Sequence, residues 1–460
     1  MTTLMTTGLD EAAVQELRTS LRGALLRPGD DQYETVRQVW NGMIDRKPAL
    51  IARCAGAADV ISAVNFARTH NLLVSVRGGG HGVAGYAVCD GGLMIDLSPM
   101  KGIRVDPARR TARAEPGLTW GEFDQETQAF GLATTGGVVH TTGIAGLTLG
   151  GGIGLLMRRF GLACDNLLSI DIVTADGRLR TASSTENADL FWGVRGGGGN
   201  FGIVTSFEYR LHPVGPMVLG GIIVHPLTVA KEALQFYREF TRTEPDELTT
   251  YCGMAASLPD GDQPVMAFAP CYSGPLEKGE EVVRPLREFG SPVADMVGPM
   301  PYTALQALSG PFYPPGRLNY WKSSFLKELS DDAIETMIAQ FASVPSRFSF
   351  VGLEELGGAV SRVGKDETAF GERSARYSFL ITSAWTDPAE SEKNIRWTRD
   401  FWEAMRPFQS EAAYVNYLGA EGQDRIRAAY GEKYERLVAL KNKYDPTNLF
   451  RLNQNIKPTV

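Results

Sequence analysis

Glycine is concentrated in one stretch of this 460-residue chain, and that concentration constrains the fold more than any other feature. Of the 51 glycines, 27 lie between Arg77 and Val204, where they make up about 21% of the residues against about 7% elsewhere. The stretch also contains Leu, Ile, Val and Trp and has no three-residue repeat, which excludes a collagen-like or low-complexity segment. We therefore expect its glycines to meet local backbone needs, such as a positive φ or close approach of the main chain to a ligand.

Composition excludes several classes of protein. The chain is 43% hydrophobic and 22% charged, so it can bury a large core, and its length favours more than one domain. A net charge of −7 without a run of Lys or Arg argues against nucleic acid as a partner. Five scattered cysteines without a Cys-x-x-Cys pair predict neither a disulfide framework nor a zinc site, and no metal is expected. No apolar run of about 20 residues and no leader-like N-terminus occurs, which predicts a cytoplasmic protein that does not enter the membrane.

The periodicity of apolar residues indicates an α+β protein rather than a strict βαβ repeat. We expect helices at 57–70 and 120–130, a strand at 72–76, and mostly short strands and turns beyond it. Glycine then falls to background while prolines and aromatic residues become more frequent. This change predicts a domain boundary near 210–218, followed by a second unit of strands and amphipathic helices that runs to about 410.

Three glycine-rich loops, at 78–85, 143–154 and 196–202, are the candidate ligand-binding elements. Glycine lets backbone N–H groups approach an anion or a flat ring, so several such loops suggest a long ligand wrapped by backbone, while each loop alone could equally be a tight turn. The pattern Gly-x-Gly-x-x-Gly begins at Gly80 and at Gly197, but strand-like residues follow both, whereas the dinucleotide fingerprint requires a helix. An NAD dehydrogenase is therefore disfavoured, and the absence of phosphate-loop and GxSxG motifs removes NTPases and serine hydrolases.

Two further features carry possible chemistry. His81 stands inside the first glycine loop, where a neutral imidazole held against a cofactor would be a nucleophile. The segment Tyr-Val-Asn-Tyr at 414–417 is expected to be a strand with Tyr417 and Val415 on one face, and a tyrosine there is commonly a packing residue.

Six segments occur in order along nearly the whole chain and together carry a family resemblance. They are VSVRGGGHGVAGY (74–86), TTGIAGLTLGGGIG (141–154), FWGVRGGGGNFGIV (191–204), GGAVSRVGKDETAF (357–370), YVNYLG (414–419) and YDPTNLFRLNQNIKP (444–458). In these segments the chain resembles the berberine-bridge-enzyme-like FAD-linked oxidases of the vanillyl-alcohol-oxidase and p-cresol-methylhydroxylase flavoprotein superfamily.

The resemblance implies an α+β fold built around FAD. It implies a two-subdomain FAD-binding domain of the p-cresol-methylhydroxylase type over 1–212, with its core at about 45–212. A substrate domain over 213–412 would carry an antiparallel sheet flanked by helices. The C-terminal segment 413–460 would return to the FAD-binding domain.

The resemblance also implies how FAD is held. His81 matches the histidine that is bonded to the flavin 8α-methyl group. Many members add a bond from a cysteine to flavin C6, but Val139 stands at that position and Cys164 lies outside that motif, so we expect a single histidyl link, as in the bacterial monocovalent branch. The other cofactor-binding positions implied are Arg77, Gly78, Gly79, Gly80, Gly82, Gly137, Val139, Thr142, Gly143, Gly146, Gly150, Gly152, Asn200, Gly202, Val204 and Asn453.

Catalytic roles follow from the resemblance too. Tyr417 would be the base, with Asn416 beside it, and Thr142 would act on O2. Because the ordinary pKa of tyrosine is about 10, Tyr417 would need a cation or hydrogen-bond donor nearby, and Lys322 is a candidate. The substrate-lining positions implied are Tyr320, Trp321, Glu355 and Glu372.

The implied activity is oxidation of a small molecule by covalent FAD. A hydride would pass from an alcohol, amine or phenol-activated carbon to FAD, which O2 would reoxidise with release of H2O2. One alternative is an oxygenase of secondary metabolism that works through a flavin-N5-oxide, and another is a protein that sequesters flavin or a ligand without turnover. The expected assembly is a monomer or homodimer.

Overall fold

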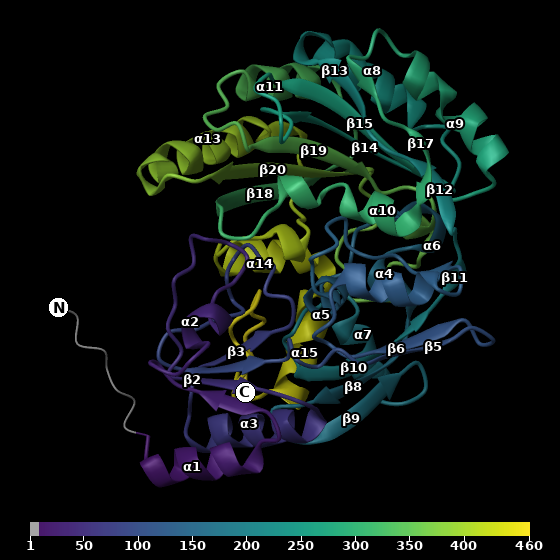
Figure 1. Cartoon of the computed structure of the whole chain (residues 1–460). Helices are drawn as coiled ribbons and strands as arrows, with labels where there is room; N and C mark the ends of the chain where they lie inside the picture. The colour runs from purple at the N-terminus through teal and green to yellow at the C-terminus, as the bar shows by residue number, and fades with distance from the viewer. Residues whose placement is uncertain (1–8) are drawn as a thin grey trace.

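This computed structural model describes residues 9–460, which form four β-sheets with their connecting helices (Figure 1). A four-stranded and a five-stranded sheet lie in the lower half of the view, and a nine-stranded sheet forms the upper half. The fourth is a two-stranded sheet of β7 (Leu132–Ala133) and β11 (His212–Pro213). Helices and antiparallel sheets in separate layers confirm the predicted α+β class.

The four-stranded sheet places the first glycine loop. Its order is β1-β2-β4-β3, and β2, β4 and β3 run parallel, so the chain leaves β3 at the carboxyl edge of the sheet and enters the loop at Gly78. Helix α3 packs on this sheet because Val60, Ala63, Val64 and Ala67 recur at helical spacing on its buried face. The elements are α1 (Glu11–Ser20), β1 (Ala24–Leu26), α2 (Tyr33–Val36), β2 (Leu50–Arg53), α3 (Ala57–Thr69), β3 (Val74–Arg77) and β4 (Leu93–Asp96).

The five-stranded sheet is antiparallel and shares a core with helices α4 and α15, which are far apart in the sequence. Leu437 and Leu440 of α15 pack into the same core as Trp120 and Phe123 of α4. The C-terminal part of the chain therefore shares a core with residues 100–211. The elements are β5 (Ile103–Asp106), β6 (Thr111–Ala114), α4 (Trp120–Gln128), α5 (Ile144–Leu149), β8 (Leu167–Val173), β9 (Leu179–Ser183), α7 (Ala188–Val194), β10 (Ile203–Arg210) and α15 (Tyr434–Tyr444).

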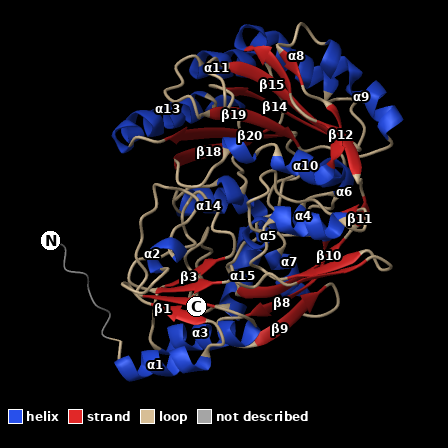
Figure 2. Ribbon diagram, in the orientation of Figure 1, coloured by secondary structure: helices blue, strands red, loops and turns tan. Residues whose placement is uncertain are grey.

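The nine-stranded sheet is antiparallel, and its helices lie on the side away from the two lower sheets (Figure 2). Because side chains alternate along a strand, Ile381 of β20 packs beneath the helices while Leu380 and Thr382 face the interior of the molecule. The strands are β12 (Met217–Gly220), β13 (Ile223–Pro226), β14 (Leu248–Ala255), β15 (Val265–Tyr272), β16 (Ala294–Asp295), β17 (Gly298–Pro301), β18 (Leu318–Leu326), β19 (Phe350–Glu355) and β20 (Tyr377–Trp385). The covering helices are α8 (Ala230–Phe240), α9 (Leu276–Glu288), α11 (Asp331–Phe341) and α13 (Ser391–Ala404).

Short helices connect these layers. They are α6 (Met157–Phe160), α10 (Tyr302–Ala307), α12 (Ala359–Arg362) and α14 (Gln423–Tyr430), with 3-10 turns η1 (Ala163–Asn166), η2 (Leu227–Val229), η3 (Gly310–Phe312), η4 (Pro388–Glu390), η5 (Arg406–Phe408), η6 (Val415–Tyr417) and η7 (Gly431–Lys433). The predicted strand at 414–417 is wrong, because Val415–Tyr417 form the 3-10 turn η6, which contacts β18 of the nine-stranded sheet. Within residues 9–460, no helix is long and apolar enough to cross a membrane.

Candidate active site

A cavity of about 450 Å³ lies between the glycine loops and the inner face of the nine-stranded sheet. A second cavity of about 240 Å³ is lined by the third glycine loop and by the tail at 450–454. The two cavities share Gly78, Gly82, Gly146 and Asn416 in their walls. Together they form an elongated space suited to a long ligand.

Glycines shape this space in two different ways. A Cβ on Gly79 would lie 2.4 Å from the backbone nitrogen of Gly143, and one on Gly143 would lie 2.4 Å from that of Gly79, so the first two loops touch only because both residues lack a side chain. By contrast, a Cβ on Gly82, Gly146 or Gly199 would meet no atom within 4 Å. These three positions leave backbone facing the open cavities, which is what close approach of a ligand requires.

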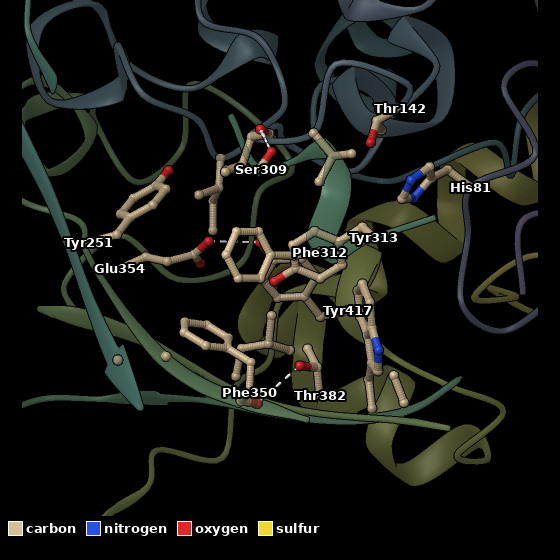
Figure 3. A pocket seen from close by; sticks show the side chains of 18 of the residues that line it. His81, Thr142, Tyr251, Ser309, Phe312, Tyr313, Phe350, Glu354, Thr382 and Tyr417 are labelled. Carbon is tan, nitrogen blue, oxygen red and sulfur yellow. Dashed lines mark hydrogen bonds between the residues drawn. The ribbon is translucent and has the colours of Figure 1, made fainter. Parts of the chain in front are cut away.

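His81 faces the larger cavity from the first loop (Figure 3). Its ring stacks on Trp40 with 4.5 Å between centroids and an interplanar angle of 16°. Its Nε2 atom is buried and has no hydrogen-bond partner within residues 9–460. Burial lowers the pKa of His81 to about 4, so the imidazole is neutral at neutral pH and keeps an unprotonated nitrogen.

Tyr417 and Glu354 form a hydrogen-bonded pair in the same cavity (Figure 3). The Tyr417 hydroxyl donates to Glu354 Oε1 over 2.8 Å, and Glu354 is 8% exposed. Burial raises the pKa of Glu354 to about 7, against the opposing effect of the hydrogen bond from Tyr417. Burial, together with the charge of Glu354, raises the pKa of Tyr417 well above its usual value. Glu354 is therefore the member of the pair that changes protonation near neutral pH.

Asn416 links the C-terminal segment to the second glycine loop by hydrogen bonds. Its side-chain amide donates to the Leu147 carbonyl over 2.9 Å and to the Tyr414 hydroxyl over 2.8 Å. The Tyr414 hydroxyl in turn accepts from the Gly152 amide over 2.9 Å. A Cβ on Gly150 would lie 2.1 Å from Asn416 Oδ1, so this glycine makes room for Asn416.

Most residues that the sequence singled out meet in the two cavities. The cavity walls contain Gly78, Gly79, Gly80, His81, Gly82, Val139, Thr142, Gly143, Gly146, Asn200, Gly202, Val204, Trp321, Asn416, Tyr417 and Asn453. Four predicted cofactor-binding residues lie behind the walls. They are Arg77, which donates to the Val36 carbonyl, Gly137, which packs on Leu147 and Trp120, and Gly150 and Gly152, which accommodate Asn416 and Ala163.

Strand alternation corrects two of the four predicted substrate-lining positions. On β18, Trp321 faces the cavity, whereas the Tyr320 hydroxyl accepts from Arg399 on the outer, helix-covered side. On β19, Glu354 faces the cavity, and Glu355 points to the other face. On β18 both neighbours were predicted to line the cavity and only Trp321 does, while on β19 only Glu355 was predicted and Glu354 lines it, because one step along a strand exchanges the two faces.

Two further predicted residues, Glu372 and Lys322, lie outside the cavity walls. Glu372 accepts from the Ser374 amide over 2.6 Å and does not line the cavity. Lys322 pairs with Glu421 over 2.5 Å. The partner of the Tyr417 hydroxyl is the carboxylate of Glu354, where the sequence analysis expected a cation or a donor.

Several cavity residues were not predicted from the sequence. For Glu354 a signal exists, because two successive carboxylates within the apolar strand 350–355 place one of them on each face. For the aromatic residues of the cavity wall no such signal exists, because they come from loops and strands that are far apart in the sequence. They include Tyr251, Phe312, Tyr313 and Phe350 (Figure 3).

Comparison with known proteins identifies the class. Residues 48–183 match the FAD binding domain family, and residues 413–457 match the family described as berberine and berberine like. An FAD-linked oxidoreductase of Dictyostelium discoideum is 35% identical over 451 residues, covering 97% of each chain. The (R)-6-hydroxynicotine oxidase of Paenarthrobacter nicotinovorans is 31% identical over 451 residues, covering 95% of this chain and 97% of its own. The solved structure of 6-hydroxy-D-nicotine oxidase from Arthrobacter nicotinovorans superposes with a TM-score of 0.88 at 29% identity, covering 95% of this chain and 98% of that one.

Fold, cavity and relatives together define an FAD-linked oxidoreductase. Within that class, the chain belongs to the berberine-bridge-enzyme-like family.

The residues of the two cavities fit FAD. The larger cavity has the neutral His81 and apolar walls that suit a flat flavin ring, and the smaller one has glycine backbone at 198–199 that suits phosphate groups. Buried Asn453 Oδ1 and Gln454 Oε1 in the smaller cavity have no hydrogen-bond partner in the described part of the chain. Unpaired buried polar atoms of this kind are expected where a polar ligand belongs.

Proposed function

We propose that this protein is an oxidase that removes a hydride from an alcohol, amine or phenol-activated carbon of a small molecule. The observation that carries the proposal is the Tyr417–Glu354 pair, which opens into the same cavity as His81. A proton acceptor and a flavin site in one enclosed space are the two components that hydride removal from an X–H group requires.

Different parts of the chain line the two cavities, and we assign the binding of FAD and of the substrate to these parts accordingly. We assign FAD to residues 1–212 with 413–460 and the substrate to residues 213–412, because the smaller cavity is lined by residues 74–204 and 415–454 while strands of the nine-stranded sheet wall the larger one. When bound, FAD accepts the hydride and passes two electrons to O2, which leaves as H2O2.

The Tyr417–Glu354 pair handles the substrate proton. In the ionised state Glu354 accepts the hydrogen bond from Tyr417, so Tyr417 can pass its proton to Glu354 as its oxygen receives the proton of the substrate hydroxyl or ammonium. The net result moves one proton from substrate to Glu354 and leaves Tyr417 unchanged. This route needs no tyrosinate in the resting enzyme, which suits a tyrosine whose pKa is raised.

His81 supplies the single attachment point for FAD. Its neutral imidazole retains a nitrogen lone pair that would bond to the flavin 8α carbon, with loss of one methyl C–H proton and the imidazole N–H proton and with the two electrons passing to O2, which becomes H2O2. Val139 lines the cavity and has no thiol, and Cys164 is fully buried in a separate apolar cluster with its sulfur 3.6 Å from Asp165 Oδ1. A second link through cysteine is therefore not part of the proposal.

Thr142 faces the cavity on the same side as His81 (Figure 3). Its backbone amide donates a hydrogen bond to the Val139 carbonyl, and its carbonyl accepts one from the Trp120 amide. These two bonds hold the loop in place while the Thr142 hydroxyl projects from it. We assign this hydroxyl to the handling of O2 during reoxidation.

A substrate panel tests the proposed function. Aromatic alcohols, sugars and hydroxylated polycyclic phenols are mixed anaerobically with the yellow protein, and bleaching of the flavin identifies those that donate a hydride. Readmitted O2 should restore the colour and yield one H2O2 per turnover. Incorporation of oxygen into the product without H2O2 would show an oxygenase, and the absence of bleaching with every compound would oppose catalysis altogether.

A further inference from the structure

Charge is distributed unevenly along the larger cavity. Among the residues that line it in the described part of the chain, the only Asp, Glu, Lys or Arg side chains are Glu354, Arg317 and Arg347. Glu354 already accepts a hydrogen bond from Tyr417. The proposed oxidation gives the two arginines no role.

Sheet register places both arginines at one end of the cavity and Glu354 at the other. Arg317 immediately precedes β18, and Arg347 precedes β19 by three residues; both strands pair antiparallel with β20, so they begin at the same edge of the sheet. Glu354 lies near the far end of β19, four residues beyond Phe350. At about 3.3 Å per residue, the arginine end is roughly 13 Å or more from Glu354.

Neither arginine has an acidic partner within residues 9–460. Both guanidinium groups lie over the ring of Phe348, Arg317 at 3.9 Å and Arg347 at 5.6 Å from its centroid. Arg317 donates to the Phe312 carbonyl over 3.2 Å, and Arg347 donates to the Gly261 carbonyl. Carbonyls fix the orientation of these groups but leave both positive charges uncompensated, in a chain whose net charge is −7.

The two guanidinium groups, one half-buried and one exposed, form a positively charged end to the cavity. Partial burial lowers the pKa of Arg317, and the neighbouring charge of Arg347 lowers it further. Two like charges held beside one ring repel each other, and a bidentate oxyanion is the ligand whose geometry matches the guanidinium fork.

The wall between the two ends is mostly apolar. Its residues include Leu258, Leu308, Phe312, Phe350 and Leu380. A sugar would leave many hydroxyl groups unpaired against this wall, whereas an aromatic or otherwise apolar body would bury favourable surface.

We propose that the substrate has an apolar, ring-containing body with an oxyanion group, carboxylate or phosphate, at the end opposite the oxidised carbon, and that Arg317 and Arg347 bind that group. This inference rests on the proposed function, because it takes the reacting end of the substrate to lie at Tyr417 and Glu354. The arginines act in binding and not in the proton transfer.

Matched probes test the inference on the FAD-loaded protein. The probes are 6-hydroxy-2-naphthoate, 6-hydroxy-2-naphthyl phosphate and the neutral 6-hydroxy-2-naphthamide, with binding read from the change in the visible flavin spectrum. At least one anionic probe should bind about tenfold or more tightly than the amide, as expected for charge-assisted hydrogen bonds. The tighter of the two anions identifies the oxyanion group.

Variants assign the preference to the two arginines. Arg317→Gln and Arg347→Gln should each reduce the anion-to-amide ratio severalfold with little change in binding of the amide, and Arg347 is exposed enough for its substitution to be tolerated. Arg104→Gln removes one charge from an exposed position on β5, away from the cavity, and should leave the ratio unchanged.

The outcomes separate this inference from the proposed function. Equal affinity for all three probes, or an anion preference that survives both arginine variants, overturns the oxyanion site while leaving the oxidase proposal standing. If no probe perturbs the flavin spectrum, the cavity does not bind a ring that carries an oxyanion and this inference falls, while flavin bleaching by the substrate panel still decides the oxidase proposal.

Discussion

The Tyr417 hydroxyl donates a hydrogen bond of 2.8 Å to Glu354 Oε1 and so joins the C-terminal segment to strand β19 across the larger cavity. The two residues are 63 positions apart in the sequence and come from different layers of the fold. Burial raises the pKa of both groups, so Tyr417 stays protonated at neutral pH while Glu354, with a pKa of about 7, supplies the proton acceptor. The pair places a titrating carboxyl behind a tyrosine that faces the substrate, which is the arrangement on which the proposed oxidase depends.

The pH dependence of flavin reduction should follow Glu354. Its pKa is raised to about 7, so the carboxyl is protonated below that pH and cannot take the Tyr417 proton. The rate of anaerobic flavin reduction should therefore rise as pH increases through about 7 and then level off. In Glu354→Gln this inflection should vanish; an inflection that persists near 7 in the variant would assign it to another group.

Covalent attachment should depend on His81. Acid-precipitated wild-type protein should stay yellow, because a bonded flavin cannot be washed out, and His81→Ala should lose the colour on precipitation. Arg77→Lys is a control, since Arg77 lies behind the loop and donates to the Val36 carbonyl. Yellow precipitate from the alanine variant would place the bond on another side chain.

The number of covalent bonds should be one. Cys164 is buried away from both cavities, so Cys164→Ala should retain the mass of a single FAD adduct. Under denaturing conditions, wild type and variant should also show the same flavin absorption spectrum. A change in that spectrum, or loss of the adduct, would mean that the thiol reaches the flavin.

Gly150→Ala should destabilise the protein through Asn416. The added methyl would lie 2.1 Å from Asn416 Oδ1, and Asn416 cannot move freely because it is bonded to Leu147 and Tyr414. The free energy of unfolding should fall by about 1–3 kcal/mol, the usual cost of overpacking. Gly298→Ala on β17 is the matched control, since a Cβ there meets nothing within 4 Å, and it should unfold like wild type. Equal stability of the two variants in thermal or denaturant unfolding would show that Asn416 relaxes without cost.

The sequence predicted those parts of the site whose residues lie close together along the chain. His81 and the glycines around it form one continuous segment, so their placement in a ligand cavity followed from the pattern itself. Glu355 was predicted and Glu354 was not, because strand phase is set by the tertiary environment and β19 is buried on both faces, which leaves no alternation from which to infer it.

Contacts between distant loops were beyond the reach of sequence periodicity. Arg317 and Arg347 share Phe348 only because β18 and β19 both pair with β20, a register that no local pattern specifies. The predicted strand at 414–417 failed for a similar reason, since the turn η6 is imposed by the anchoring of Asn416 and Tyr417 to two different layers.

The central claim is that Tyr417 and Glu354 act as one proton-accepting unit, and anaerobic stopped-flow reduction of the flavin by an aryl alcohol that bleaches the wild type tests it most directly. Tyr417→Phe and Glu354→Gln should each slow reduction by about 10²-fold, and the double variant should be little slower than either, because removing one member already disables the pair. Glu372→Gln, a carboxylate outside the cavity, should reduce at the wild-type rate. Near-wild-type reduction in Tyr417→Phe and Glu354→Gln, or losses that multiply in the double variant, would contradict the account.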